Sequence, residues 1–151
     1  MPRRRRERPR DPGDAQAAVR AFAEDVLALY DLPQLDTVIT LHNTYEGFSV
    51  LSYVSGGEYE QEAESVFISE GTDPNDFFFV TDVQIYDGLR AEGFNVVLQD
   101  NERATDDGSL SVYAADRGLP YANAEAQHGH HDEQVDMLLG LGEVLRMLNA
   151  T

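Results

Sequence analysis

Two polar residues lie where apolar strands are predicted to end, and their types suit metal-assisted hydrolysis. His42 follows the apolar run 35–41, and Glu125 lies near the end of the run that begins at Tyr121. In α/β sheets, ligands gather at the carboxyl ends of the strands. A neutral imidazole on a rigid strand is a good zinc ligand. A carboxylate beside a metal-bound water can serve as general base and then as general acid.

Each of these two residues also has a structural interpretation. A single histidine at a strand end often serves only as a hydrogen-bonding group, and Glu46 completes no more than a weak His-x-x-x-Glu pattern with His42. Glu125 can be a solvated acid at the end of its strand, although burying a carboxylate there without a partner is costly. The residue types alone leave both interpretations open.

A second candidate group is the histidine cluster His128, His130 and His131, which Asp132 and Glu133 follow. His130 and Glu133 have the His-x-x-Glu spacing of metal ligands, but they straddle a predicted helix start and lack an evident third ligand. The alternative is that Asp132 caps this helix and that the imidazoles lie at the edge of a cleft. The sequence contains neither a Gly-rich phosphate loop nor a serine nucleophile elbow.

The elements that would position these residues alternate between helices and short apolar strands. Helices are predicted over 15–30, 58–68, 83–92, 109–117 and from residue 132 onward. Strands are predicted over 35–41, 48–54, 77–80, 94–98 and 121–126. Asp14 and Asp82 are expected as helix caps, and Gly93 and Gly118 as helix exits. This alternation predicts an α/β fold, in which a mostly parallel or mixed sheet is flanked by helices.

The composition restricts the partners. The chain has 151 residues, enough for one domain with a real core, and no cysteine, so disulfides and thiolate chemistry are excluded. Its 28 acidic residues face 11 arginines and no lysine, which gives a net charge of −17. An acidic surface of this kind repels nucleic acid and anionic membranes. The composition resembles that of salt-accumulating halophiles, in which high salt screens the self-repulsion.

The N-terminal residues differ in charge from the rest of the chain. Six of the eleven arginines lie within residues 1–10, and we predict a basic disordered tail over 1–13. A nucleic-acid or anion-binding arm and a piece of a larger domain are the alternatives. The segment has no apolar continuation typical of a secretory signal, and no run reaches the ~18–20 apolar residues of a membrane span. The expected location is therefore the cytoplasm, away from membranes.

Three segments in one consistent order resemble the zinc carboxypeptidase superfamily, including its succinylglutamate desuccinylase and aspartoacylase branch. The first is 37–42, an apolar strand that ends in His. The second is 108–118, which looks like the family's Gly-Ser turn, aromatic-bearing helix and closing Gly. The third is the strand 121–125, where the family places its catalytic glutamate. The order extends over residues 35–148 and matches the C-terminal half of the family's domain.

The resemblance implies a zinc-dependent hydrolase of the metallocarboxypeptidase or N-acyl amino acid deacylase type. Residues 14–151 would form a partial domain in which His42 is a zinc ligand, Glu125 the catalytic acid-base and Tyr113 a residue of the substrate pocket. The cofactor would be zinc. The substrate would be a C-terminal peptide bond or an N-acyl amino acid.

The chain departs from the family upstream of His42. The family's first two zinc ligands form a His-x-x-Glu motif there, and no histidine precedes His42 in this sequence. We therefore expect a truncated domain with an incomplete zinc site and an exposed apolar edge at 35–41. That edge would favour association with a missing N-terminal half or self-association. The alternatives are a non-catalytic fragment or pseudoenzyme that acts as an interaction module, and a small binding protein that holds a metal at 128–131.

Overall fold

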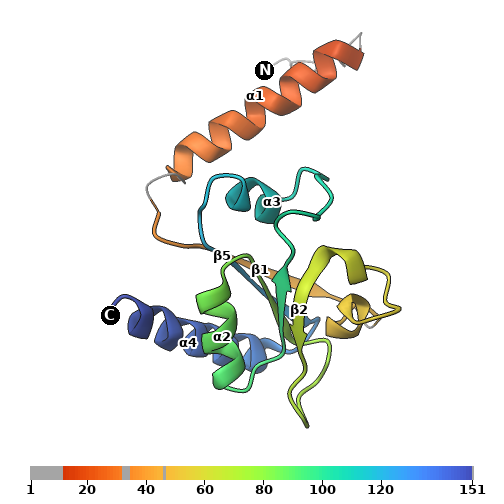
Figure 1. Cartoon of the computed structure of the whole chain (residues 1–151). Helices are drawn as coiled ribbons and strands as arrows, with labels where there is room; N and C mark the ends of the chain where they lie inside the picture. The colour runs from red at the N-terminus through yellow and green to blue at the C-terminus, as the bar shows by residue number, and fades with distance from the viewer. Residues whose placement is uncertain (1–11, 32–34, 46, 151) are drawn as a thin grey trace, which may run out of the picture. The chain divides into compact units, whose positions relative to one another are not determined.

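The computed structural model describes residues 12–31, 35–45 and 47–150, and it divides the chain into two compact units, Met1–Leu35 and Asp36–Thr151 (Figure 1). In the first unit, helix α1 (Pro12–Tyr30) confirms the helix predicted over 15–30. It begins earlier than expected, so Asp14 lies in its first turn and is not its cap. The predicted basic tail falls almost wholly on residues 1–11, outside the described residues. The boundary after residue 13 stays a prediction.

The second unit is built on a five-stranded mixed sheet, which confirms the predicted α/β class. Its strands are β1 (Val38–Thr44), β2 (Ala63–Phe67), β3 (Phe77–Val80), β4 (Val96–Gln99) and β5 (Tyr121–Gln127). The spatial order is β1-β5-β3-β4-β2. The β1–β5 and β3–β4 pairs are parallel, whereas β5–β3 and β4–β2 are antiparallel. This order makes β1 an edge strand and gives it β5, from the far end of the chain, as its neighbour.

Helices α2 (Val83–Ala91) and α4 (His131–Leu148) pack against each other and cover one face of this sheet (Figure 1). Leu89 and Leu141 are fully buried in this layer, and burial of a leucine contributes about 1.5–3 kcal/mol. Gly88 permits the close approach of the two helices, because a Cβ at this position would lie 2.5 Å from Cγ1 of Val144. The strands contribute alternate residues to this core, as expected from their period of two.

The opposite face is covered less completely, by short elements. They are the 3₁₀ helices η2 (Val50–Tyr53) and η3 (Glu60–Glu62) and the helix α3 (Leu110–Ala115). A small core of Val50, Phe77 and Val97 lies between η2 and the sheet. The incomplete cover leaves room for a cleft above β5.

The helix caps agree with the sequence in α2 and α3 and disagree in α4. Asp82 accepts hydrogen bonds from the backbone N–H groups of Gln84 and Ile85, and Gly93 ends α2 with a φ of 83°. Ser109 caps α3. The prediction that Asp132 caps the last helix is wrong, because α4 begins at His131 and Asp132 lies within its first turn.

Two further predictions are wrong in the same region of the chain. The strand expected over 48–54 is the 3₁₀ helix η2, because the Ser49 side chain caps it through the N–H of Leu51 and closes a capping box with Ser52. The helix expected over 58–68 is η3 followed by strand β2, whose residues pair with β4.

The edge strand β1 is longer than expected at its carboxyl end. Its parallel pairing with β5 continues to Thr44, so His42 lies within the strand and does not follow it. Ile39 and Leu41 project from this strand and are 45% and 51% exposed. The apolar edge predicted at 35–41 is thus exposed in the second unit.

Candidate functional site

Polar side chains line one face of the β1–β5 pair. In the parallel register Thr40 is opposite Asn123 and His42 is opposite Glu125. Because side chains alternate between the faces of a strand, residues two apart on β5 share this face. The intervening alanines of β5 pack under α4 on the other side. The structure therefore brings together His42 and Glu125, as the sequence-based prediction requires.

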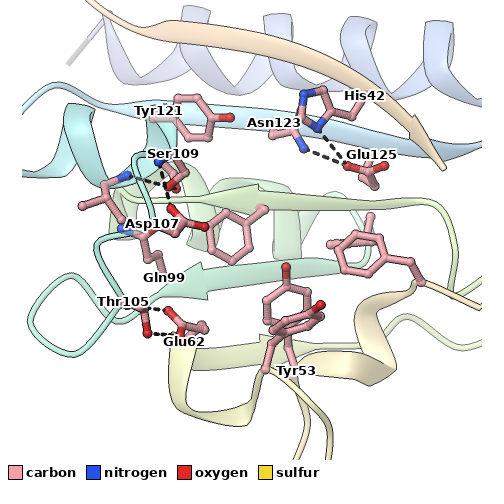
Figure 2. Close-up of a pocket in the computed structure, with 16 residues that line it drawn as sticks. His42, Tyr53, Glu62, Gln99, Thr105, Asp107, Ser109, Tyr121, Asn123 and Glu125 are labelled. Carbon is pink, nitrogen blue, oxygen red and sulfur yellow. Dashed lines mark hydrogen bonds and ion pairs between the residues drawn. The ribbon is translucent and has the colours of Figure 1, made fainter. Parts of the chain in front are cut away.

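These side chains form a connected polar network along the two strands, and Figure 2 shows the part of it that joins Asn123 and His42 to Glu125. Thr40 donates its hydroxyl to Oδ1 of Asn123 at 3.0 Å, so the Tyr121 hydroxyl donates to Thr40 Oγ1 at 2.7 Å. The Asn123 amide is thereby oriented to donate from Nδ2 to Oε2 of Glu125 at 3.0 Å. Nδ1 of His42 lies 3.5 Å from the same Oε2. The network holds one carboxylate oxygen of Glu125 from two sides.

The other oxygen of Glu125 is free in the described part of the chain. The Glu125 side chain is only 6% exposed, and no described residue forms a hydrogen bond with Oε1. Burial raises the pKa of Glu125, while the hydrogen bond from Asn123 and the proximity of His42 lower it in part. A carboxyl group with a raised pKa and one unpartnered oxygen is suited to accept and return a proton.

A cleft of 370 Å³ lies above this network. Aromatic rings of the chain segment around η2 and of strand β3 form one wall, which consists of Phe48, Tyr53, Tyr59, Phe77 and Phe79. Burial raises the pKa of the Tyr53 hydroxyl, and the nearby charge of Glu125 raises it further, so this phenol stays protonated. In Figure 2 the Tyr53 side chain points toward the strand that carries Glu125.

The loop between β4 and α3 closes one side of the cleft. The Glu62 carboxylate accepts hydrogen bonds from the N–H and the hydroxyl of Thr105 at 2.8 and 2.7 Å, which ties this loop to η3. Asp107 accepts the N–H of Ser109 at 2.8 Å, and this hydrogen bond lowers the pKa of Asp107. Both acids line the cleft.

Tyr113 does not line this cleft with the other two predicted site residues. Its ring lies beneath the Arg117 guanidinium, with Cζ 3.6 Å from the ring centroid. Ser109, Ser111 and Val112 are the residues of this segment that line the cleft. A role for Tyr113 in substrate binding stays a prediction.

The donor set of the cleft does not by itself fit a zinc ion. Zinc sites in proteins use at least three protein ligands in most cases. The described residues contain no group of three or more His, Asp or Glu side chains arranged to hold a metal ion. At the cleft, His42 and Glu125 supply two donors, and Glu125 is also the residue expected to move the proton.

The histidines at 128–131 do not converge. His128 stacks on Tyr45, with ring centroids 5.6 Å apart, and His131 is exposed at the start of α4. The His130 imidazole instead contacts the buried carboxylate of Asp76, with Nδ1 2.8 Å from Oδ2. The pair lines a separate depression. This geometry favours a structural function for His130 over a metal site.

Several cleft residues were not identified from the sequence. Asn123 carried a usable signal, since it is two residues from Glu125 and therefore shares its strand face. Tyr53 and Glu62 lie in segments whose secondary structure was predicted wrongly, so no local pattern pointed to them. Gln134 of α4 was not identified from the sequence either. Its amide donates hydrogen bonds to the carbonyl oxygens of His42 in β1 and Ala124 in β5, at 2.8 and 3.2 Å, and so links the two strands.

Comparison with known proteins adds no relative. No family model, no curated protein and no solved structure matches this chain. In the described part of the chain, no helix has the length and apolar character needed to cross a membrane.

Proposed function

We propose that this chain carries the ligand cleft and the proton-transfer glutamate of a zinc-carboxypeptidase-type hydrolase, and that it binds ligands without turning them over unaided. The observation that carries the proposal is the registered pair on β1 and β5. His42 and Glu125 meet across two parallel strands, at the floor of an aromatic cleft. Their spacing and residue types are those of the two sequence segments that resemble this family.

Glu125 is the proton-transfer group in this proposal. Asn123 and His42 contact its Oε2, which leaves Oε1 available to a water molecule or a substrate proton in the cleft that Glu125 lines. Its raised pKa brings the protonated and ionised forms closer in free energy near neutral pH. Tyr53 remains a hydrogen-bond donor at the opposite wall.

His42 is the residue proposed as a zinc ligand, with further ligands supplied from outside the described residues. The substrates proposed from the resemblance are peptides with a free C-terminus and N-acyl amino acids. The cleft volume of 370 Å³ lies within the range of small-molecule sites and suits a ligand of this size.

The test is the zinc content and the activity of the purified chain in molar salt. We expect less than one zinc per chain after dialysis and background amidase activity on both substrate classes. We also expect calorimetric binding of at least one member of the substrate panel, which Glu125→Gln weakens and the matched surface variant Glu70→Gln does not. Stoichiometric zinc with turnover, or failure of every panel member to bind, contradicts the proposal.

A second candidate function is association through β1, favoured by the exposure of Ile39 and Leu41 on an edge strand. Edge strands present unpaired backbone groups that can pair with another strand. The partner proposed is a second copy of this chain. Sedimentation should show a dimer that Leu41→Lys disrupts and that Ile68→Lys, at an exposed position outside β1, leaves intact. A monomer at all concentrations rules this candidate out.

A further inference from the structure

We infer that the cleft recognises an organic cation of the alkylammonium or quaternary ammonium class, with the Glu125 carboxylate as its counter-ion. The inference rests on the proposed function, since it concerns the same cleft, and it specifies the chemical class of the group bound there. It narrows the two substrate classes proposed above, because a peptide carries an ammonium group that this cleft can bind, whereas an N-acyl amino acid carries a carboxylate and no ammonium group.

The first reason to expect a cation is the set of charges that line the cleft. Three carboxylates line it, those of Glu62, Asp107 and Glu125, and none of the described arginines does. Three of these arginines have partners elsewhere, namely Arg103 with Asp100, Arg146 with Glu143 and Arg117 with the ring of Tyr113. Among the described lining residues, a ligand carboxylate would thus meet three acids and no arginine.

The second reason is the buried position of the Glu125 carboxylate. Most acids of this chain are exposed, and solvent and salt screen their charges. The Glu125 side chain is 94% buried, and its Oε1 has no partner among the described residues. An ionised carboxylate that is withdrawn from water is stabilised by an opposite charge at hydrogen-bond distance. The cleft is the open side from which this charge can approach Oε1.

The third reason is the aromatic wall of the cleft. The rings of Tyr53 and Tyr59 have centroids 5.6 Å apart and are tilted by 37° to each other. The centroid of the Phe48 ring lies 6.1 and 6.0 Å from those of Tyr53 and Tyr59, at interplanar angles of 70° and 73°, and all three residues line the cleft. Cations are attracted to the faces of such rings, and quaternary ammonium groups are often recognised in this way. A cation between this wall and Oε1 would use both interactions.

The test compares three probes of the same shape that differ in charge. They are choline, the neutral 3,3-dimethylbutan-1-ol and the anionic 3,3-dimethylbutanoate. Binding to the full chain is measured by calorimetry at the lowest salt concentration at which circular dichroism shows a folded protein, and again in 2 M NaCl. We expect choline to bind about tenfold more tightly than the alcohol or better, and no saturable binding of the anion. The difference in affinity between choline and the alcohol should become smaller in 2 M NaCl, because salt screens the charge of the carboxylate.

Variants assign the preference to the cleft. Glu125→Gln should weaken choline binding about tenfold and leave the alcohol unchanged, because it removes the charge and keeps the shape. Tyr59→Leu, a second variant that keeps every charge, should also weaken choline more than the alcohol. Glu70→Gln removes one exposed acid away from the cleft and should change neither.

The outcomes separate this inference from the proposed function. If an N-acyl amino acid binds and choline does not, or if all three probes bind equally, the cation specificity is wrong and the cleft remains a ligand site. If neither the three probes nor the substrate panel binds, both proposals fail. Weakening of choline binding by Glu70→Gln as strong as that by Glu125→Gln would also overturn the inference, since it would indicate general attraction to an acidic surface.

Discussion

Two histidine–carboxylate pairs in the second unit look alike in composition and differ in how their carboxylates are satisfied. Asp76 and Glu125 are both buried, at 6% and 5% exposure. Oδ1 of Asp76 accepts the N–H of Gln127 at 2.9 Å, and both of its oxygens lie within 3.1 Å of Nδ1 of His130. Both contacts of Glu125, by contrast, go to one oxygen.

This difference separates a structural pair from a functional candidate. The Asp76–His130 pair joins the loop before β3 to the end of β5 and to the start of α4, and both oxygens of Asp76 are engaged. Glu125 lines a cleft, and one of its carboxylate oxygens has no hydrogen-bond partner among the described residues. Burial alone is therefore a poor guide to function in this chain, and the remaining hydrogen-bonding capacity of the buried group is the better one.

The largest effect on stability is expected at the Asp76–His130 pair, in which both carboxylate oxygens are engaged. Asp76→Ala should lower the free energy of unfolding by about 2–4 kcal/mol, because it removes a buried carboxylate that accepts the Gln127 N–H and contacts the His130 imidazole. Urea unfolding measures this change. The matched variant Asp136→Ala, at an exposed position on the same depression, should have little effect. A loss below about 1 kcal/mol for Asp76→Ala would show that the pair is not structural.

Glu125 should behave in the opposite way. Its pKa is raised in the folded state, so the folded protein holds this proton more strongly than the unfolded chain does. The stabilising contribution of this proton is therefore fully present below pH 4.5, the ordinary pKa of a glutamate. It is lost as pH rises through the raised pKa of Glu125 in the folded protein. Glu125→Gln should remove this loss and stabilise the protein by on the order of 1 kcal/mol at neutral pH, with a smaller difference at pH 4.

Thermal unfolding of both proteins from pH 4 to pH 8 measures this effect. Glu70→Gln is the control, since it removes an exposed charge of the same sign. If Glu125→Gln destabilises the protein equally at both ends of this range, the carboxylate has a structural function like that of Asp76.

The third effect is smaller and has the same direction with pH, because the pKa of His130 is also raised in the folded protein. The hydrogen bond to Asp76 raises the pKa of His130. A raised histidine pKa contributes stability that is fully present below the ordinary value of 6.5 and is lost as pH rises through the folded pKa. His130→Gln should therefore destabilise the protein more at pH 5.5 than at pH 9. His131→Gln is the matched control, since it replaces an exposed neighbouring imidazole. A difference for His130→Gln that does not change with pH would contradict the assignment.

The sequence was informative where local signals agree with one another. Strand β3 matches its predicted bounds because four apolar residues stand between a loop and a helix cap. Helix α2 matches closely because Asp82 and Gly93 mark its two ends by side-chain capping and a positive φ. The α/β class follows from the alternation of such elements, so it too could be predicted.

The remainder depends on contacts between distant segments. The residues of 48–54 look strand-like, yet the Ser49 side chain caps a 3₁₀ helix there and closes a capping box with Ser52. The cleft could be predicted only in part: the resemblance paired His42 with Glu125, but the aromatic wall comes from this same misread segment. No local pattern specifies the order β1-β5-β3-β4-β2, which decides the neighbours of each strand.

The most direct test is a pH titration of the Glu125 carboxyl carbon by ¹³C NMR, in the parent protein and in His42→Ala. The His42 side chain is 67% exposed, so this variant should remain folded. We expect Glu125 to titrate above the ordinary value of 4.5, because it is buried, and higher still in His42→Ala, because the imidazole lowers the pKa of this carboxyl group. A Glu125 pKa at the ordinary value, unchanged by His42→Ala, would contradict the claim that these two residues form one buried site.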